Sequence, residues 1–260
     1  QGGSLQDTSP GFQQWFGESQ AVTPDGQPLL AAHATLDDDI TVFDTAGFGT
    51  HIGQVKQANQ RLRDIANKGS GLILDRNLPG SNVMPVYLSI QNPLRMPDVG
   101  VWRDSAAVAD ALIQMDINRD DVIEIREEAE DIKSQFTYSE FSEDQLVDED
   151  GNEIRVSPDA SPWTESQENR DLLDELQSII EFAGYDGVVY ENAVEGQGDS
   201  FIPFDPTQIK SPFNEGTYDP NEADILKQED QTQQTIDEVA ETLGPAAAAE
   251  LAPQPGDQFQ

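Results

Sequence analysis

Three short segments of the chain carry side chains and glycines that could build a ligand site. They are His33-Ala34-Thr35, then Gly47-Phe48-Gly49-Thr50-His51-Ile52-Gly53, and finally Asp199-Ser200-Phe201-Ile202-Pro203-Phe204-Asp205. An imidazole can bond a ligand hydroxyl or stack on a flat ring, and backbone beside glycine can approach a ligand closely. The first and last segments border apolar runs that predict strands. We therefore expect the three segments to meet as strand ends around a cleft.

Each candidate residue also has a plainer interpretation. His33 alone would more often be a hydrogen-bonded strand residue, but the order of the three segments favours a role in a ligand cleft. His51 is equally well a residue at a turn or a helix entry, and Ser200 is most simply a polar residue at a strand edge. Asp199 and Glu195 are nearby acids that could reach a ligand, although loop acids in so acidic a chain are usually solvated.

The charge of the chain narrows its partners. Among 260 residues there are 14 Lys and Arg against 50 Asp and Glu, which gives a net charge of −36. Nucleic acid and anionic membranes both require clustered cations, so neither is an expected partner. The charge fits a self-repelling protein or one with a basic partner.

The absence of cysteine excludes disulfides and thiol catalysis. No apolar run approaches the roughly 20 residues that span a bilayer, so membrane insertion is not expected. The chain begins at Gln1 without a signal-peptide pattern, and we interpret it as a piece of something longer.

Short strands mixed with a few helices predict an α+β domain. Apolar periodicity predicts helices near 12–16, after 53, near 105–115 and over 172–183, and strands near 29–32, 85–90, 187–190 and 201–204. We place a loose lead-in at 1–10, the domain at 11–218 with an acidic insertion at about 104–165, and an acidic, Ala- and Pro-rich tail at 219–260, mostly extended with one weak helix near 236–243.

A calcium loop is an open alternative within the acidic insertion. Asp116, Asn118, Asp120 and Glu127 have the spacing of loop positions 1, 3, 5 and 12 of an EF-hand. Position 6 normally requires glycine, and here it is Asp121. The plainer interpretation is an acidic helix–turn–helix, so no metal is assigned.

The first segment resembles a signature of the diphtheria-toxin and poly-ADP-ribose-polymerase type of ADP-ribosyltransferase. That family has His, then Gly, then Ser or Thr on its first core strand, and His33-Ala34-Thr35 is similar, with Ala34 in place of glycine. The resemblance implies that His33 bonds the adenosine ribose of NAD. It also implies that Ala34 and Thr35 hold the nicotinamide.

The other two segments resemble the remaining signatures of the family. Residues 47–53 are similar to a Gly-x-Gly-x-Tyr-Phe pattern, which puts Gly49 against NAD and His51 where a tyrosine stacks on nicotinamide. Residues 200–209 line up with a strand that begins with glutamate, which puts Ser200 at that position. The resemblance thus assigns the catalytic positions to His33, His51 and Ser200, without the usual carboxylate.

A fuller resemblance, over residues 11–228, is to ADP-ribosyltransferase-like domains of phage polyvalent proteins. It implies split antiparallel β-sheets with flanking helices and an acidic helical insertion. The matching motifs are Phe12-Gln13-Gln14-Trp15-Phe16-Gly17, Asp25-Gly26-Gln27-Pro28-Leu29, Pro85-Val86-Tyr87-Leu88, Gly184-Tyr185-Asp186-Gly187-Val188, Asp205-Pro206-Thr207-Gln208-Ile209-Lys210-Ser211 and Gly216-Thr217-Tyr218-Asp219-Pro220-Asn221.

The resemblance implies a phage protein that is carried in the virion and delivered into the host cytoplasm. Its substrate would be NAD, its acceptor a host protein, and its other partners virion proteins. Mono-ADP-ribosylation is the most that these residues suggest. The alternative is a catalytically inactive structural or ejected virion protein that retains the fold, because folds host many functions.

Overall fold

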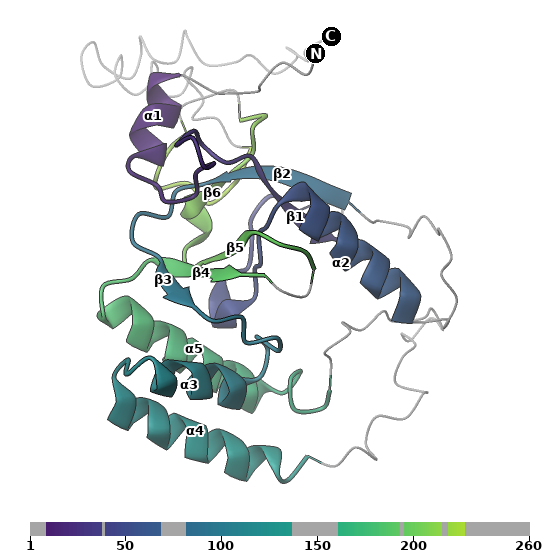
Figure 1. Ribbon diagram of the computed structural model, residues 1–260, viewed down its shortest axis with the longest axis vertical. Helices are drawn as coiled ribbons and strands as arrows, with labels where there is room; N and C mark the ends of the chain where they lie inside the picture. The colour runs from purple at the N-terminus through teal and green to yellow at the C-terminus, as the bar shows by residue number, and fades with distance from the viewer. Residues whose placement is uncertain are drawn as a thin grey trace, which may run out of the picture.

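The computed structural model describes residues 9–37, 40–68, 82–136, 161–192, 195–214 and 218–226. The predicted weak helix near 236–243 lies outside these residues, as do positions 1–8 of the lead-in predicted at 1–10. The helices are α1 (Pro10–Phe16), α2 (Val55–Lys68), α3 (Ser105–Gln114), α4 (Arg119–Lys133) and α5 (Gln167–Phe182) (Figure 1). The strands are β1 (Ala31–Thr35), β2 (Asn82–Leu88), β3 (Leu94–Met96), β4 (Gly187–Glu191), β5 (Asp199–Pro203) and β6 (Ile209–Lys210).

The strands form two small sheets, as an α+β domain of this type predicts. One sheet has the order β1-β2-β6 and is antiparallel throughout. The other has the order β3-β4-β5, in which β4 and β5 are antiparallel but β3 runs parallel to β4. The split sheets that the resemblance implies are therefore confirmed, with β3 as a described strand that runs parallel to its neighbour. The chain reaches β4 from β3 through α3, α4 and α5, and such a helical crossover returns it in the same direction.

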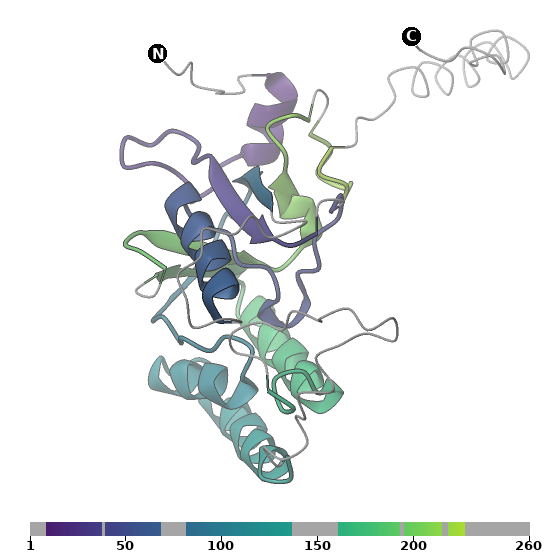
Figure 2. The same cartoon turned by 90° about the vertical axis from the view of Figure 1, so that its right-hand side faces the viewer.

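Alternate residues of the second sheet face two different cores. Val188 and Ile202 pack in the core shared with α3, α4 and α5, which form a helical layer at one end of the molecule (Figures 1 and 2). Val189 and Phe201 pack in the core shared with the first sheet. The sheet β3-β4-β5 thus lies between the helical layer and the sheet β1-β2-β6, and α2 packs on β1 and β2.

Capping residues mark the starts of α3 and α5 and the end of α5. The side chain of Asp104 accepts a hydrogen bond from Ala106 N at the start of α3, and that of Ser166 accepts one from Asn169 N at the start of α5. Gly184 follows α5 with φ of 95°, the left-handed conformation in which glycine ends a helix.

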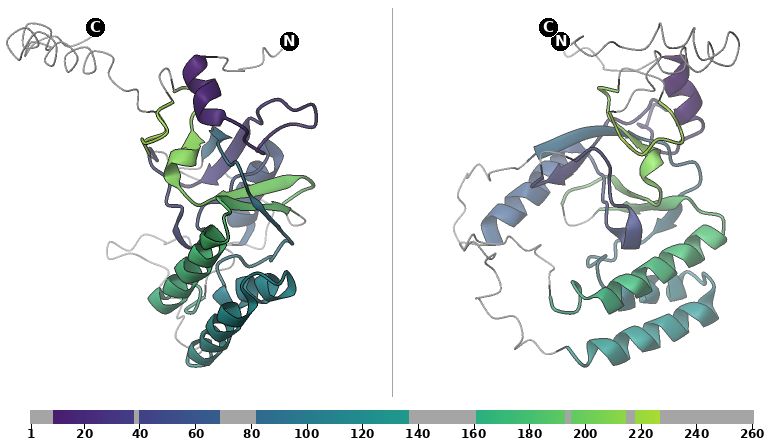
Figure 3. Two further views of the ribbon diagram at one scale, coloured as in Figure 1. Left: turned by 90° about the vertical axis from the view of Figure 1, so that its left-hand side faces the viewer. Right: turned by 180° about the vertical axis from the view of Figure 1, so that it is seen from behind.

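An aromatic cluster fixes α1 at the opposite end of the molecule from the helical layer (Figure 3). It consists of Phe12, Trp15, Phe16, Tyr87 and Tyr218. Tyr218 is 1% exposed, so the last described segment is part of this packing.

The chain continues to pack against the domain beyond the expected boundary at 218. Ile225 is buried in the core between the sheets, and its N–H donates to Thr41 O at 2.8 Å. Lys210 is buried on β6, and its Nζ donates to the backbone oxygens of Glu222 and Asp224. Residues 219–226 are therefore a structural part of the domain.

The candidate calcium loop is instead a turn followed by a helix. Helix α4 begins at Arg119, so Asp120 and Glu127 lie on one helix, about 10 Å apart along its axis. Two ligands at that separation cannot close on one cation at the 2.3–2.6 Å that calcium requires. Asn118 Nδ2 instead donates to Asp121 Oδ2 at 2.6 Å. Among the described residues, no group of three or more His, Cys, Asp or Glu side chains is placed to hold a metal ion.

Within the described part of the chain, no helix is long and apolar enough to cross a membrane.

Candidate active site

Residues 52–53 connect the two sheets through backbone hydrogen bonds. Gly53 N donates to Ala32 O at 3.1 Å, and Ala32 N donates to Gly53 O at 2.7 Å. On the other side, Ile52 N donates to Phe201 O at 2.9 Å, and Phe201 N donates to Ile52 O at 2.7 Å. The three segments singled out in the sequence therefore lie side by side, in the order β1, residues 52–53, β5.

A cavity of about 350 Å³ opens beside this connection. Its size falls within the range of small-molecule sites. All six predicted site residues line it: His33, Ala34, Thr35, Gly49, His51 and Ser200. The structure thus brings together residues that lie up to 167 positions apart in the sequence.

His33 is held in one tautomer by the backbone of His51. Its Nδ1 lies 2.9 Å from His51 O. A carbonyl oxygen only accepts, so Nδ1 carries the proton and Nε2 is the nitrogen that can accept a bond from a ligand. Burial lowers the pKa of His33, which keeps the ring neutral at pH 7. The ring also packs edge-on against Phe43, with centroids 5.1 Å apart.

His51 belongs to an aromatic group that forms one wall of the cavity. Its Nδ1 lies 2.9 Å from the Tyr190 hydroxyl, and the Trp102 ring centroid lies 4.7 Å from that of Tyr190 and 5.8 Å from that of His51. Burial, with the positive charge of Arg61, lowers the pKa of His51 to about 3. Burial raises the pKa of Tyr190. All three rings are therefore neutral near pH 7.

Ser200 is 2% exposed and its hydroxyl is already engaged. Asn192 Nδ2 donates to Ser200 Oγ at 3.2 Å, and Ser200 lies opposite Tyr190 in the β4–β5 ladder. A Cβ on Gly53 would lie 2.9 Å from Ser200 Oγ, so glycine is required for this close approach.

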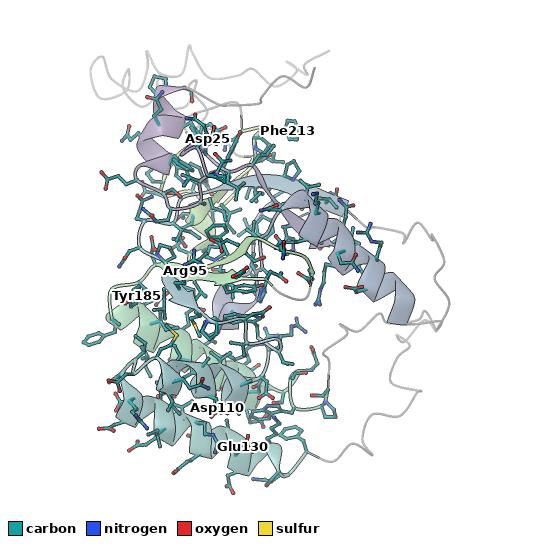
Figure 4. All side chains as sticks on the ribbon, viewed as in Figure 1. Asp25, Arg95, Asp110, Glu130, Tyr185 and Phe213 are labelled. Carbon is teal, nitrogen blue, oxygen red and sulfur yellow. The ribbon has the colours of Figure 1, made fainter. Side chains whose placement is uncertain are left out.

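The two acids considered near Ser200 differ in position. Asp199 lies outside the cavity lining and forms a two-pronged ion pair with Arg95 on β3, at 3.1 and 2.7 Å (Arg95 is labelled in Figure 4). Glu195 lines the cavity, and its Oε1 lies 3.7 Å from Nε of Arg61 on α2. Of these two acids, Glu195 is thus the one that can reach a ligand.

Two of the chain's 14 cationic residues, Arg61 and Arg103, also line the cavity. A second hollow of about 380 Å³ adjoins it, sharing His33, Gly49 and Arg103 as wall residues. The two adjoining hollows therefore have aromatic, polar, cationic and acidic residues in their walls.

Several lining residues carry no sequence motif and were not predicted: Tyr190, Trp102, Asn192, Arg61 and Gln57. Tyr190 could have been predicted from the sequence, because pairing the expected strands 187–190 and 201–204 as a hairpin sets Tyr190 opposite Ser200. Trp102 and Arg61 come from a distant loop and from a helix face, for which no local pattern signals a site.

The chain was compared with known proteins in three ways. A family model described as ADP-ribosyltransferase in polyvalent proteins matches residues 24–217. No curated protein matches the chain, and no solved structure does. The matched residues contain all six predicted site positions and every strand of both sheets. Since the match covers well over half of the 260 residues, the chain belongs to the ADP-ribosyltransferase family of polyvalent proteins.

Proposed function

We propose that this domain binds NAD in the cavity and transfers its ADP-ribose to a single site on an acceptor. ADP-ribosyltransferases use NAD as their substrate, and the chain belongs to such a family. The observation that carries the proposal is the connection at residues 52–53, which gathers His33, His51 and Ser200 around one cavity.

Each wall of the cavity suits one part of NAD. His33 Nε2 accepts a bond from a hydroxyl of the adenosine ribose, while the backbone of Ala34 and Thr35, with Gly49 near by, holds the nicotinamide amide. The neutral rings of His51 and Trp102 can face the cationic pyridinium without charge repulsion.

The cationic wall suits the charged centre of the dinucleotide. Arg61 and Arg103 can bond the pyrophosphate, for which guanidinium groups have matching geometry. The second hollow offers space for the half of NAD that the first cavity does not hold.

Transfer of a single ADP-ribose is the activity that fits a serine at position 200. The family resemblance places a glutamate at position 200, and Ser200 provides no carboxylate there. We therefore propose one ADP-ribose per site, with no chain elongation.

The polyvalent family suggests a phage protein that acts after delivery from the virion into the host cytoplasm. A host protein is the proposed acceptor, and other virion proteins are proposed partners. The net charge of −36 favours an acceptor with a basic surface. Figure 4 labels two of the acids, Asp110 and Glu130, on the helical layer at one end of the molecule.

A second candidate is a virion protein that kept the fold and lost the activity. The observation in its favour is Ser200, which is buried, bonded to Asn192, and set where the resemblance places a glutamate. Such a protein would show no saturable binding of NAD.

Two measurements separate these functions. Calorimetric titration tests NAD binding, and incubation with labelled NAD and host lysate tests transfer. His33→Ala should weaken NAD binding by about tenfold, the value of one hydrogen bond, and should reduce labelling. Asn59→Ala, on the exposed face of α2 outside the cavity lining, is the matched control and should behave as wild type. Wild-type protein that neither binds NAD nor labels any acceptor would contradict the proposed enzyme.

A further inference from the structure

We propose that Glu195, on the loop between β4 and β5, supplies the catalytic carboxylate that position 200 lacks. This inference rests on the proposed function, because it names the group that stabilises the reacting ribose of NAD. It assigns the role to a position five residues before the one that the family resemblance indicates.

One amide group places Glu195 beside Ser200. Asn192 Nδ2 donates both to Ser200 Oγ at 3.2 Å and to Glu195 Oε2 at 3.0 Å. Asn192 Oδ1 in turn accepts a hydrogen bond from Glu195 N at 2.8 Å, so the nitrogen and the oxygen of the Asn192 amide both bond Glu195. The Glu195 carboxylate and the Ser200 hydroxyl therefore both accept hydrogen bonds from the Asn192 amide. Ser200 occupies the position where the resemblance places a glutamate.

The loop that carries Glu195 is tied to the start of α2. Gln57 Nε2 donates to Gly196 O and to Gly198 O, each at 3.0 Å, and Gln57 Oε1 accepts from Gln54 N at 2.5 Å. Gly196 and Gly198 have φ of 131° and 128°, a conformation that favours glycine. The described residues 195–198 of the loop are thus tied to α2, next to the cavity that Glu195 lines.

The charge next to Glu195 also fits this role. Arg61 lies 3.7 Å from Oε1, while Oε2 takes the bond from Asn192, so both oxygens have a polar neighbour that orients them. The Glu195 side chain is 20% exposed, compared with 39% for Asp199, which pairs with Arg95 outside the cavity lining. Glu195 and Asp199, four residues apart, therefore have different surroundings, and a variant of Asp199 is a matched control for one of Glu195.

The proposed step is a substitution at C1′ of the nicotinamide ribose. The bond from C1′ to the pyridinium nitrogen breaks, and its electron pair leaves with nicotinamide, which becomes neutral. Positive charge develops on C1′ and the ring oxygen, where the Glu195 carboxylate stabilises it. The acceptor's oxygen or nitrogen then forms the new bond to C1′, and its proton passes to solvent.

The test measures nicotinamide release and NAD binding on the same proteins: wild type, Glu195→Gln, Asp199→Asn and the double variant Glu195→Gln/Ser200→Glu. Glu195→Gln should release nicotinamide about 100-fold more slowly, the typical effect of one electrostatic group, with the Kd for NAD within about threefold of wild type. Asp199→Asn should retain wild-type release. The double variant should recover about tenfold or more over Glu195→Gln, because it returns a carboxylate to the neighbouring position.

The outcomes distinguish this inference from the function on which it rests. If wild type releases nicotinamide and Glu195→Gln releases it equally fast, the role of Glu195 is refuted and the proposed function stands. If Glu195→Gln loses NAD binding in step with its rate, Glu195 is a binding residue and not the catalytic carboxylate. If wild type binds NAD but releases no nicotinamide, the proposed catalysis and this inference both fail.

Discussion

The hydroxyl of Tyr190 lies 2.9 Å from Nδ1 of His51, and this contact joins the middle strand of one sheet to the segment that links both sheets. Neither ring is charged near pH 7, because desolvation lowers the pKa of His51 to about 3 and raises that of Tyr190. An uncharged wall suits a pyridinium cation, which a protonated imidazole would repel. The unusual pKa of His51 is thus part of the proposed binding of NAD.

The same pKa predicts a specific acid sensitivity. In the unfolded chain His51 binds a proton below about pH 6.5, whereas in the folded protein it does so only near pH 3. Between these values the unfolded state binds more protons, so the neutral ring lowers stability progressively as the pH falls below about 6.5. His33 has a pKa shifted in the same direction and adds to the effect.

His51→Gln removes this titration and keeps a polar side chain. The free energy of unfolding should then fall less between pH 7 and pH 4 in the variant than in wild type, by on the order of 3 kcal/mol. Urea unfolding at several pH values measures both curves. Because all other titrating groups are shared, parallel curves would show that His51 is not held neutral.

Gly53→Ala is predicted to disturb the connection between the sheets. A Cβ there would clash with Gln57 Oε1 and would lie 2.9 Å from Ser200 Oγ. Gly53→Ala should cost about 1–3 kcal/mol of stability, typical of overpacking, and should impair NAD binding because it displaces two cavity residues.

Gly26→Ala is the control for this substitution. Gly26 has φ of 79° and an added methyl would meet no atom within 4 Å, so the variant carries backbone strain alone. Melting temperature and NAD affinity are measured for both. Equal NAD affinity in Gly53→Ala and wild type would argue against a role of this close approach in the site.

Lys210 is predicted to hold residues 218–226 on the domain. It is 1% exposed and its ammonium group bonds the backbone oxygens of Glu222 and Asp224. Lys210→Met preserves the side chain's bulk but leaves these oxygens without their donor, which should cost about 1–3 kcal/mol.

Limited proteolysis tests whether Lys210 holds residues 218–226. Lys210→Met should be cleaved within 218–226 faster than wild type, because the segment loses its attachment. Lys56→Met, on the exposed face of α2, should be cleaved at the wild-type rate there. Identical cleavage of Lys210→Met and wild type would mean that Lys210 does not hold the segment.

The sequence predicts local structure well where caps and periodicity act together. Asp104 begins α3, and Gly184 follows the end of α5, as their residue types indicate. It fails for β3, a three-residue strand whose formation depends on pairing with β4. A strand that short has too few residues to show alternation, and only the tertiary pairing reveals it.

The sequence also predicts only part of the candidate site. His33 and His51 stand in segments with a recognisable order, and the structure places both at one cavity. Trp102 and Asn192 have no such signature, because their places depend on the path of a loop and on the β4–β5 hairpin. Glu195 and Asp199 could not be distinguished in the sequence, since only the positions of Arg61 and Arg95 separate them.

The most direct test of the central claim is a crystal structure of the domain with NAD, or with a non-cleavable analogue of NAD. We predict the dinucleotide in the cavity that His33, His51 and Ser200 line, with a ribose hydroxyl bonded to His33 Nε2 and the nicotinamide ring against His51. Crystals grown with saturating dinucleotide whose cavity stays empty, or in which the dinucleotide binds elsewhere, would contradict the account.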